Sequence, residues 1–258
     1  MISSAIRAYV GKVIRRSKSI RDQLYPREQR PWAVFTREVL RLASTDSVLV
    51  DVGCGREAIW LRSVSHAYKM CYGIDPEADS WHEEGLNVMR GEGTAIPLPS
   101  AVADVVTLMN VTEHLSDPQA VLTECARILR PGAHLVLLAP NAWFPPICVG
   151  RLLPHRIRQS INWIITATDV EDTFPAFYRA NTERALVRMG TRAGLIPIKT
   201  EYLSNHPEYF MFSTLLYRCM AALERGVLRR PQFRQYRHSI LVWFQREATT
   251  PTDRQQER

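Results

Sequence analysis

Strand-like apolar segments alternate with helical patterns through the middle of the chain. Five such segments lie near 48–52, 70–74, 86–89, 104–109 and 134–139, and helical patterns near 57–66 and 117–129 fall between them. Apolar runs with little polar alternation are typical of strands that helices cover on both faces. The alternation of strand and helix predicts an α/β fold built on a doubly wound, mostly parallel, Rossmann-like sheet.

The pattern changes on both sides of this region. Residues 1–44 predict a helical N-terminal extension, because an apolar stripe is flanked by basic residues; the stripe consists of Ile6, Tyr9, Val10, Val13 and Ile14. Pro26 and Pro31 interrupt the extension before a second helix from Trp32 to Leu42. Near the other end, Thr182 as N-cap and Gly194 as stop predict a last helix.

A glycine turn after the first strand is the most informative local feature. Val48 to Val52 end in a turn that contains Gly53, Cys54 and Gly55, and the strand carries Asp51 near its carboxyl end. Glycine lets the chain turn sharply and lets a ligand approach the backbone. Asp75 ends a second short strand 20 residues on, where a carboxylate suits ribose hydroxyls.

The turn leaves two kinds of nucleotide ligand open. Ala58 stands where a dinucleotide fingerprint has its third glycine, which weakens that reading without excluding it. A phosphate-loop Gly-Lys-Ser/Thr is missing from the turn. A nucleoside cofactor without phosphates fits at least as well.

Further motifs follow in a fixed order. They are Gly91 to Pro99, Ala103 to Asn110, Val111 to Pro118 and Ala126 to Gly132. Together with the glycine turn, this set resembles the class I S-adenosylmethionine-dependent methyltransferases, specifically the type 11 methyltransferase domain of ubiquinone and menaquinone biosynthesis enzymes. The resemblance covers about residues 45–142, and it implies S-adenosylmethionine as cofactor.

The resemblance also implies roles for single residues. The cofactor-binding set would be Asp51, Gly53, Cys54 and Gly55 around the methionine end, Asp75 on the ribose, Pro76 beside the adenine, Glu92 and Thr94 near the adenine edge, and Asn110 beside the transferred methyl group. In this family the segments 195–202 and 238–246 would form a terminal antiparallel hairpin. Insertions are expected at about 143–181 and 203–236, and both are rich in aromatic residues and arginine.

Two positions leave alternatives open. Glu57 stands where the family has a small residue, so it either crowds the cofactor or points away as an early helix residue. His114 is the candidate catalytic base, because the pKa of histidine suits proton transfer near neutral pH. The alternative for His114 is a structural role near the helix that begins with Asp117 as N-cap and Pro118 in its first turn.

Charge and cysteine usage narrow the class of protein. The net charge of +7 lies at the ends: residues 1–31 hold eight Lys and Arg against two acids, and 224–258 hold eight against four. Five scattered cysteines without metal spacing favour a reducing cytoplasm and no bound metal. The amphipathic, basic stretch 1–20 suggests peripheral contact with an anionic membrane, whereas nucleic acid ranks lower because no RNA-binding module is visible.

These observations predict a methyltransferase domain at 45–247, with the N-terminal extension at 1–44 and a disordered tail at 248–258. The expected acceptor is a small or lipid-linked molecule, methylated at oxygen. Two alternatives stay open at this point. A non-catalytic binding or scaffold protein would follow if Glu57 spoils the turn, and an RNA methyltransferase would follow if the basic ends bind RNA.

Overall fold

Contacts divide the computed structural model into two compact units. The structure describes residues 4–152, 176–205, 207 and 210–248. The sheet unit comprises Phe35–Pro140, Ala176–Glu201 and Ile240–Arg258, and the helical unit comprises Met1–Val34, Asn141–Pro175 and Tyr202–Ser239. The predicted insertions thus group mainly with the N-terminal extension. The domain boundaries drawn from the sequence stay a prediction, because each unit combines separate stretches of chain.

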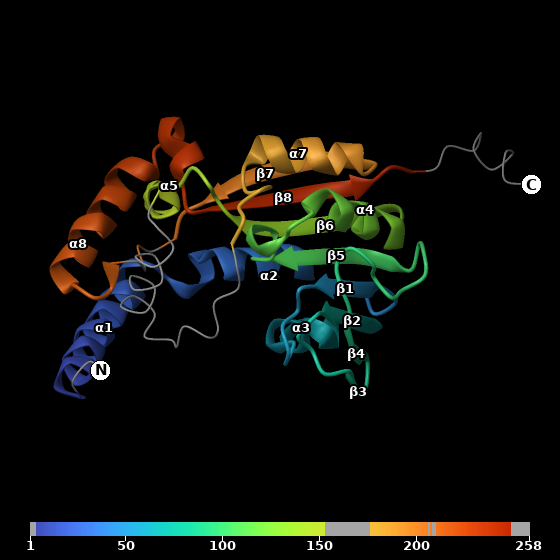
Figure 1. The fold of residues 1–258 in the computed structure, drawn as a ribbon, viewed down its shortest axis with the longest axis horizontal. Helices are drawn as coiled ribbons and strands as arrows, with labels where there is room; N and C mark the ends of the chain where they lie inside the picture. The colour runs from blue at the N-terminus through green and yellow to red at the C-terminus, as the bar shows by residue number, and fades with distance from the viewer. Residues whose placement is uncertain (1–3, 153–175, 206, 208–209, 249–258) are drawn as a thin grey trace, which may run out of the picture. The chain divides into compact units, whose positions relative to one another are not determined.

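An eight-stranded sheet forms the core of the sheet unit (Figure 1). The strand order is β3-β4-β2-β1-β5-β6-β8-β7. Bounds are β1 Val48–Val52, β2 Met70–Asp75, β3 Trp81–Glu83, β4 Leu86–Arg90, β5 Ala103–Met109, β6 Leu129–Pro140, β7 Leu195–Leu203 and β8 Ser239–Arg246. Strands β4, β2, β1, β5 and β6 pair in parallel, and β8 runs opposite to β5 in Figure 1. The predicted sheet and its terminal hairpin are confirmed.

Two features of the sheet differ from the prediction. Strand β3 was not predicted; it pairs antiparallel with β4 at the edge, and its three residues are half-buried or exposed, so that it leaves no apolar run. Strand β6 begins at Leu129 rather than near His134. The sequence around Pro131 and Gly132 reads as a turn, yet the strand passes through it with a register shift opposite Ala103 to Val105.

Helices cover the sheet where the crossover rule requires them. The helices are α3 Ile59–Val64, α4 Pro118–Ile128 and α7 Glu183–Arg192, with short 3-10 turns at Ser65–Ala67 and Thr112–His114. The chain steps from β1 to β2 in one direction and from β5 to β6 in the other. Right-handed crossovers therefore put α3 and α4 on opposite faces. Asp117 and Thr182 cap α4 and α7 as predicted, by accepting from the backbone N–H of Ala120 and Ala185.

The central strands hold the buried core of the sheet unit. Leu49, Val50, Val106 and Leu135 have no exposed surface. Their burial on both sides of the sheet explains why the sequence of these strands lacks polar alternation. The core fixes the carboxyl ends of the strands, which carry the predicted site.

The helical unit contains α1 Ser4–Leu24, the first residues of α2 Pro31–Leu40, α5 Pro145–Leu152 and α8 Thr214–Leu223. A π-helix at Glu224–Leu228 and 3-10 turns at Arg27–Gln29 and Pro231–Tyr236 complete it. Helices α1 and α8 lie side by side (Figure 1), and they share an apolar cluster made of Ile20, Leu24, Tyr25, Met211, Tyr217 and Ala221. Both predicted N-terminal helices are confirmed.

A buried carboxylate anchors the π-helix to α1. The hydroxyl of Tyr25 donates to Glu224 at 2.9 Å, and Arg229 donates to the other carboxylate oxygen at 3.3 Å. Glu224 is only 5% exposed. A carboxyl group buried this far is tolerated because both of its oxygens are hydrogen-bonded.

Candidate functional site

The predicted site residues of the sheet unit gather at the carboxyl ends of β1, β2, β4 and β5. Strand β1 lies between β2 and β5, and the chain leaves β1 and β5 in opposite directions. Open α/β sheets bind ligands in the crevice at such a reversal of strand order. Asp51, Asp75 and Asn110 all lie at this edge, as the sequence predicted.

The glycine turn has a conformation that only glycine adopts without strain. Gly53 and Gly55 have φ values of 81° and 73°. A Cβ at Gly53 would lie 2.3 Å from Cγ2 of Val111, whereas a Cβ at Gly55 would meet nothing within 4 Å. Gly53 is therefore needed for a close approach of two segments. Gly55 faces open space, as a ligand-binding turn requires.

Ala58 explains how the turn works without a third glycine. It has a φ of 47°, in the left-handed region, and it is the N-cap residue of α3. Alanine accepts this conformation at a cost of about 1–2 kcal/mol. Helix α3 therefore begins at Ile59, two residues later than predicted, and Glu57 lies before the helix rather than in its first turn.

The carboxylate of Asp75 holds the glycine turn against β2. Its two oxygens accept from the backbone N–H groups of Gly55 and Glu77, each at 2.9 Å. A carboxylate has about four acceptor sites, so capacity for ribose hydroxyls remains. Pro76 follows directly and is exposed.

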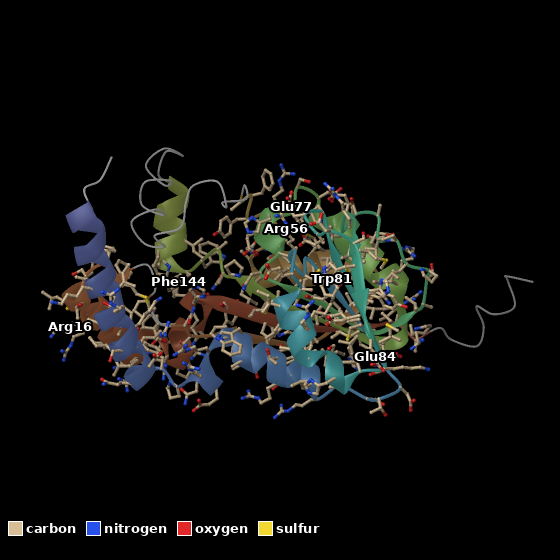
Figure 2. All side chains as sticks on the ribbon, turned by 90° about the horizontal axis from the view of Figure 1, so that it is seen from below. Arg16, Arg56, Glu77, Trp81, Glu84 and Phe144 are labelled. Carbon is tan, nitrogen blue, oxygen red and sulfur yellow. The ribbon has the colours of Figure 1, made fainter. Side chains whose placement is uncertain are left out.

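A second set of contacts fastens the turn from outside. Arg56 donates to the backbone carbonyl of Glu77 at 3.3 Å and lies 3.6 Å from its carboxylate, while Trp81 donates to the carbonyl of Arg56 at 3.5 Å. Figure 2 shows Arg56, Glu77 and Trp81 close together. Glu57 is exposed. Exposure of Glu57 agrees with both alternatives, crowding of the cofactor or a side chain that points away, so both stay predictions.

Asp51 is more enclosed than the sequence suggests. It is 2% exposed, and Thr107 of the neighbouring strand β5 donates its hydroxyl to Oδ1 at 2.8 Å. Burial raises the pKa of Asp51 to about 7, a net value that includes the lowering effect of the Thr107 hydrogen bond and a smaller raising effect of the Asp75 charge. A cation bound near Asp51 would favour its ionised form.

Cys54 fills space rather than supplying a nucleophile. A Cβ added to Gly73 would lie 2.7 Å from its sulfur, so the thiol packs closely on β2. Burial, together with the charges of Asp51 and Asp75, raises the pKa of the Cys54 thiol to about 12. A thiol with such a pKa stays protonated at neutral pH.

The loop after β4 carries Glu92 and Thr94, both exposed. The backbone N–H of Gly91 donates to the carbonyl of Asp75 at 3.2 Å, which places the loop beside the carboxyl end of β2. A Cβ at Gly93 would lie 3.3 Å from Val52 and Val121. The loop is therefore seated on the end of β1 and on α4.

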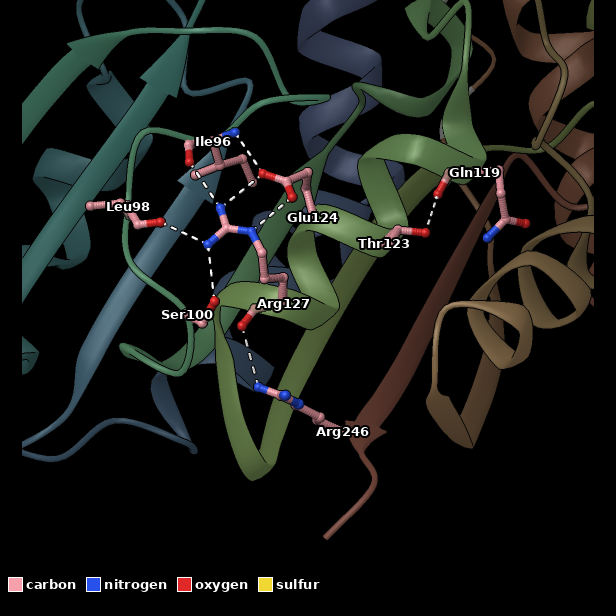
Figure 3. A network of polar contacts seen from close by, with 8 residues as sticks. All are labelled: Ile96, Leu98, Ser100, Gln119, Thr123, Glu124, Arg127 and Arg246. Carbon is pink, nitrogen blue, oxygen red and sulfur yellow. Dashed lines mark hydrogen bonds and ion pairs between the residues drawn. The ribbon is translucent and has the colours of Figure 1, made fainter. Parts of the chain in front are cut away.

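One ion pair holds the continuation of this loop (Figure 3). Arg127 of α4 donates to the carbonyls of Ile96 and Leu98, each at 2.9 Å, and pairs with Glu124 at 2.8 Å. Glu124 in turn accepts from the backbone N–H of Ile96 at 2.9 Å. The hydrogen bond that Arg127 donates to Glu124 lowers the pKa of the Glu124 carboxyl group. Sequence reasoning quoted the motif around Arg127 without giving the arginine this positioning role.

The segment after β5 brings the candidate base to the same edge. Asn110 has a φ of 56°, a left-handed conformation that asparagine tolerates, and its N–H donates to the carbonyl of Leu138 at 2.8 Å. Glu113 and His114 follow in a 3-10 turn, where the imidazole Nε2 lies 3.9 Å from Oε1 of Glu113. Glu113 is buried and His114 is half-buried. The catalytic role of His114 stays a prediction.

Residues 176–181 brace this turn. The backbone N–H groups of Phe177 and Tyr178 point to the carbonyl of Glu113, at 2.6 and 3.2 Å. Arg179 donates to the carbonyl of Ser116 at 2.6 Å, so its described contact is structural. Of the insertion predicted at about 143–181, residues 153–175 lie outside the described residues.

Sequence reasoning missed two buried polar residues of the site. The amide of Asn181 donates to the hydroxyl of Thr112 at 3.2 Å and to the carbonyl of Pro140 at 3.1 Å, which ties the ends of β5 and β6 together. Thr107, which holds Asp51, is the other. The signal for Thr107 was present, because it is the one polar residue within the run from Val105 to Met109.

The residues fit a nucleoside cofactor such as S-adenosylmethionine. The turn is open beside Gly55, carboxylates stand at two strand ends, and the Cys54 thiol packs on β2. Within the part of the chain that the structure describes, no group of three His, Cys, Asp or Glu side chains is placed to hold a metal ion.

Comparisons with known proteins point to one family. A family model described as a methyltransferase domain matches residues 26–199. A probable S-adenosylmethionine-dependent methyltransferase of Mycolicibacterium smegmatis is 30% identical over 169 residues, which cover 61% of this chain and 65% of that protein. A ubiquinone biosynthesis O-methyltransferase of Serratia proteamaculans is 32% identical over 106 residues, or 37% and 44% of the two chains.

These matches span less than two thirds of each relative. A crystal structure of an S-adenosylmethionine-dependent methyltransferase from Mesorhizobium loti shares the fold, with a TM-score of 0.56 at 15% identity over 84% of this chain and 98% of that one. The family model, the ordered motifs and the strand order agree. The chain therefore belongs to the class I S-adenosylmethionine-dependent methyltransferases.

Proposed function

We propose that the protein transfers a methyl group from S-adenosylmethionine to an oxygen atom of a small-molecule or lipid-linked acceptor. The observation that carries the proposal is the open glycine turn held by Asp75 at the switch point of the sheet, beside Asn110 and His114. The cofactor supplies a methyl group already activated on a sulfonium. The protein mainly has to bind, align and desolvate the reactants.

Different residues at this edge of the sheet would contact different parts of the cofactor and the acceptor. Asp75 offers its remaining acceptor sites to ribose hydroxyls, and Glu92 and Thr94 offer polar groups to the adenine edge. Asp51 would ionise beside the positive charges of the methionine end, because a nearby cation lowers a carboxyl pKa. Asn110 and His114 would face the acceptor.

Two observations support oxygen as the methylated atom. His114 is a half-buried imidazole beside Glu113, and such a group suits removal of a proton from a hydroxyl near neutral pH. Ubiquinone biosynthesis O-methyltransferases are also among the relatives. Those matches span under half of each relative.

Calorimetry tests cofactor binding. We expect S-adenosylmethionine and its demethylated product to bind the wild-type protein, and Asp75→Ala to lose at least tenfold in affinity. Asp79→Ala is the matched control, since Asp79 is an exposed carboxylate four residues on. Absence of heat at millimolar ligand would favour the non-catalytic scaffold instead.

The methylated atom can be read from the product. A carbon-13-labelled methyl donor, offered with a panel of phenolic, carboxylic and isoprenoid acceptors, distinguishes O-, N- and C-methylation by the chemical shift of the transferred carbon. His114→Gln should lower kcat roughly 10²-fold or more and remove the acidic limb of the pH profile if His114 is the base. A product methylated at carbon or nitrogen would overturn the choice of oxygen.

The location of the protein is part of the proposal. All five cysteines are free, which suits a reducing cytoplasm. Among the described residues, no helix has both the length and the apolar character that crossing a bilayer requires. Peripheral contact of residues 1–20 with an anionic membrane is supported by the exposed basic side chains Lys12, Arg15, Arg16 and Lys18.

A further inference from the structure

Helix α8 exposes an apolar face. Its inner face packs on α1 through Tyr217 and Ala221, which are 0% and 1% exposed. Its outer face carries Leu215, Leu216 and Leu223, which are 76%, 38% and 45% exposed. Phe212 before the helix and Cys219 within it continue the same stripe at a spacing of three and four residues.

Helix α1 does not offer an equivalent surface in its described second half. Ser17 donates its hydroxyl to the carbonyl of Met211 at 3.0 Å, and Ile20 and Leu24 pack against the apolar cluster with α8. The apolar stripe of α1 is thus used inside the helical unit from Ser17 onward. The side chains that α1 exposes between Lys12 and Gln23 are all polar: Lys12, Arg15, Arg16, Lys18, Ser19, Asp22 and Gln23.

Positive charge is concentrated in the helical unit that carries the exposed stripe. The helical unit contains 17 Lys and Arg against seven Asp and Glu, whereas the sheet unit contains 16 against 19. Residues 210–239 hold six arginines and one acid, Glu224, which is buried between Tyr25 and Arg229. Arg218, Arg225 and Arg230 are exposed.

We propose that the outer face of α8 docks on an anionic lipid surface, with its leucines in the membrane interface and the arginines at the headgroups. The proposal deepens the peripheral contact proposed above, because it assigns the apolar part of that contact to α8 and leaves α1 an electrostatic part. Charge favours this occupant over a second copy of the chain, since two units of such positive charge repel each other. Apolar area and attraction to anionic lipids together set the affinity of such helices.

Vesicle sedimentation tests the assignment. The triple variant Leu215→Gln, Leu216→Gln and Leu223→Gln should bind equimolar phosphatidylglycerol and phosphatidylcholine vesicles at least about tenfold more weakly than the wild type. The matched control is Ile196→Gln with Ile198→Gln, which replaces exposed apolar residues on β7 of the sheet unit. Both variants change solvent-exposed side chains, so both should fold, and both should keep the cofactor affinity measured by calorimetry.

A fluorescent probe on the stripe gives a second readout. An environment-sensitive fluorophore on Cys219, in a Cys54→Ala and Cys148→Ala background, should shift to shorter wavelength with anionic vesicles and not with phosphatidylcholine alone. Unchanged vesicle binding of the triple variant would overturn the proposal. So would a wild-type dimer in sedimentation equilibrium that the triple variant dissociates. If the wild-type protein does not bind the cofactor in calorimetry, the proposed catalytic function is wrong. The vesicle experiment would still decide the membrane proposal by itself.

Discussion

At the residue scale, Gly53 and Gly55 of the glycine turn distinguish the cost of a steric clash from the cost of a left-handed backbone conformation. Gly53→Ala adds a Cβ 2.3 Å from Val111 in a left-handed conformation, whereas Gly55→Ala adds only the unfavourable conformation. We expect Gly55→Ala to lower the free energy of unfolding by about 1–2 kcal/mol. Gly53→Ala should cost a further 1–3 kcal/mol or so for overpacking. Urea denaturation of the two variants measures the difference.

The double variant Gly53→Ala with Val111→Ala checks the assignment of this difference to a clash. Removing the Val111 methyl groups should bring the cost of Gly53→Ala close to that of Gly55→Ala, once the effect of Val111→Ala alone is subtracted. Equal destabilisation by both glycine variants from the start would contradict the close packing of Gly53 on Val111.

Asp51 makes the stability of the ligand-free protein depend on pH. Its pKa rises from an ordinary value of 3.8 to about 7, chiefly by burial, so the native state binds more protons than the unfolded state between these pH values. Stability should therefore fall as pH rises from about 4 to 7 by this contribution, to a total of a few kcal/mol. Asp51→Asn should abolish the contribution and stabilise the ligand-free protein at pH 8.

To test this, the thermal stabilities of the wild type and Asp51→Asn are measured at pH 5 and at pH 8, and the difference between the two proteins is compared at the two pH values. Other titrating groups cancel in that difference. The same substitution should weaken binding of the cationic cofactor, because the carboxylate charge is lost. A difference that stays constant with pH would show that Asp51 is ionised throughout.

The sequence was sufficient to predict which residues form the candidate site, but not how those residues are arranged. Glycines, acids and an asparagine after successive strands indicated the site. The enclosure of Asp51 by Thr107 could not be read from the pattern, because it depends on the alignment of β1 with β5. Nor could the left-handed conformation of Ala58, since alanine rarely adopts it.

At the element scale, α4 holds the loop that follows β4, which carries two of the residues proposed to bind the cofactor. Arg127 and Glu124 together hold the backbone of Ile96 and Leu98. Arg127→Met should leave those carbonyls without their described donor, at a cost of about 1–3 kcal/mol. We expect faster hydrogen exchange in residues 94–100 and weaker cofactor binding, with little effect on other segments.

Thr123→Ala on the same helix is the control. Its hydroxyl donates only to the carbonyl of Gln119, one turn earlier, so its loss should not reach the loop. Equal exchange in residues 94–100 of wild type and Arg127→Met would show that the loop is held by its seat on Val52 and Val121 alone.

Strand and helix positions followed from the apolar pattern wherever an element was buried. β1, β2, β4 and β5 agree with the prediction within one residue, because central strands have no polar alternation to misread. The exposed β3 carries no such signal. The start of β6 was misplaced because Pro131 and Gly132 are usual in turns, and tertiary pairing with β5 overrides that preference.

At the scale of the whole molecule, charge and chemistry divide between two units. The residues proposed to bind the cofactor lie in the slightly acidic sheet unit, and the excess positive charge lies in the helical unit. The uneven charge could be read from the sequence, but this grouping could not, since the helical unit combines three separate stretches of chain. The same charge is compatible with lipid headgroups or with RNA, and affinity alone does not distinguish them.

Two sets of substitutions distinguish them. Arg15→Glu with Arg16→Glu reverses exposed charges on α1 and should weaken binding to anionic vesicles and to RNA alike, mainly at low salt, because screening shortens electrostatic reach. Arg188→Glu with Arg192→Glu on α7 is the control, with equal charge change on the sheet unit.

The glutamine variant of the α8 leucines should weaken vesicle binding only, since an apolar face contributes to entry into lipid and little to phosphate contacts. If RNA binds more tightly than vesicles, with log affinity falling steeply with log salt and unaffected by the leucine substitutions, the acceptor is RNA and the basic unit recruits it.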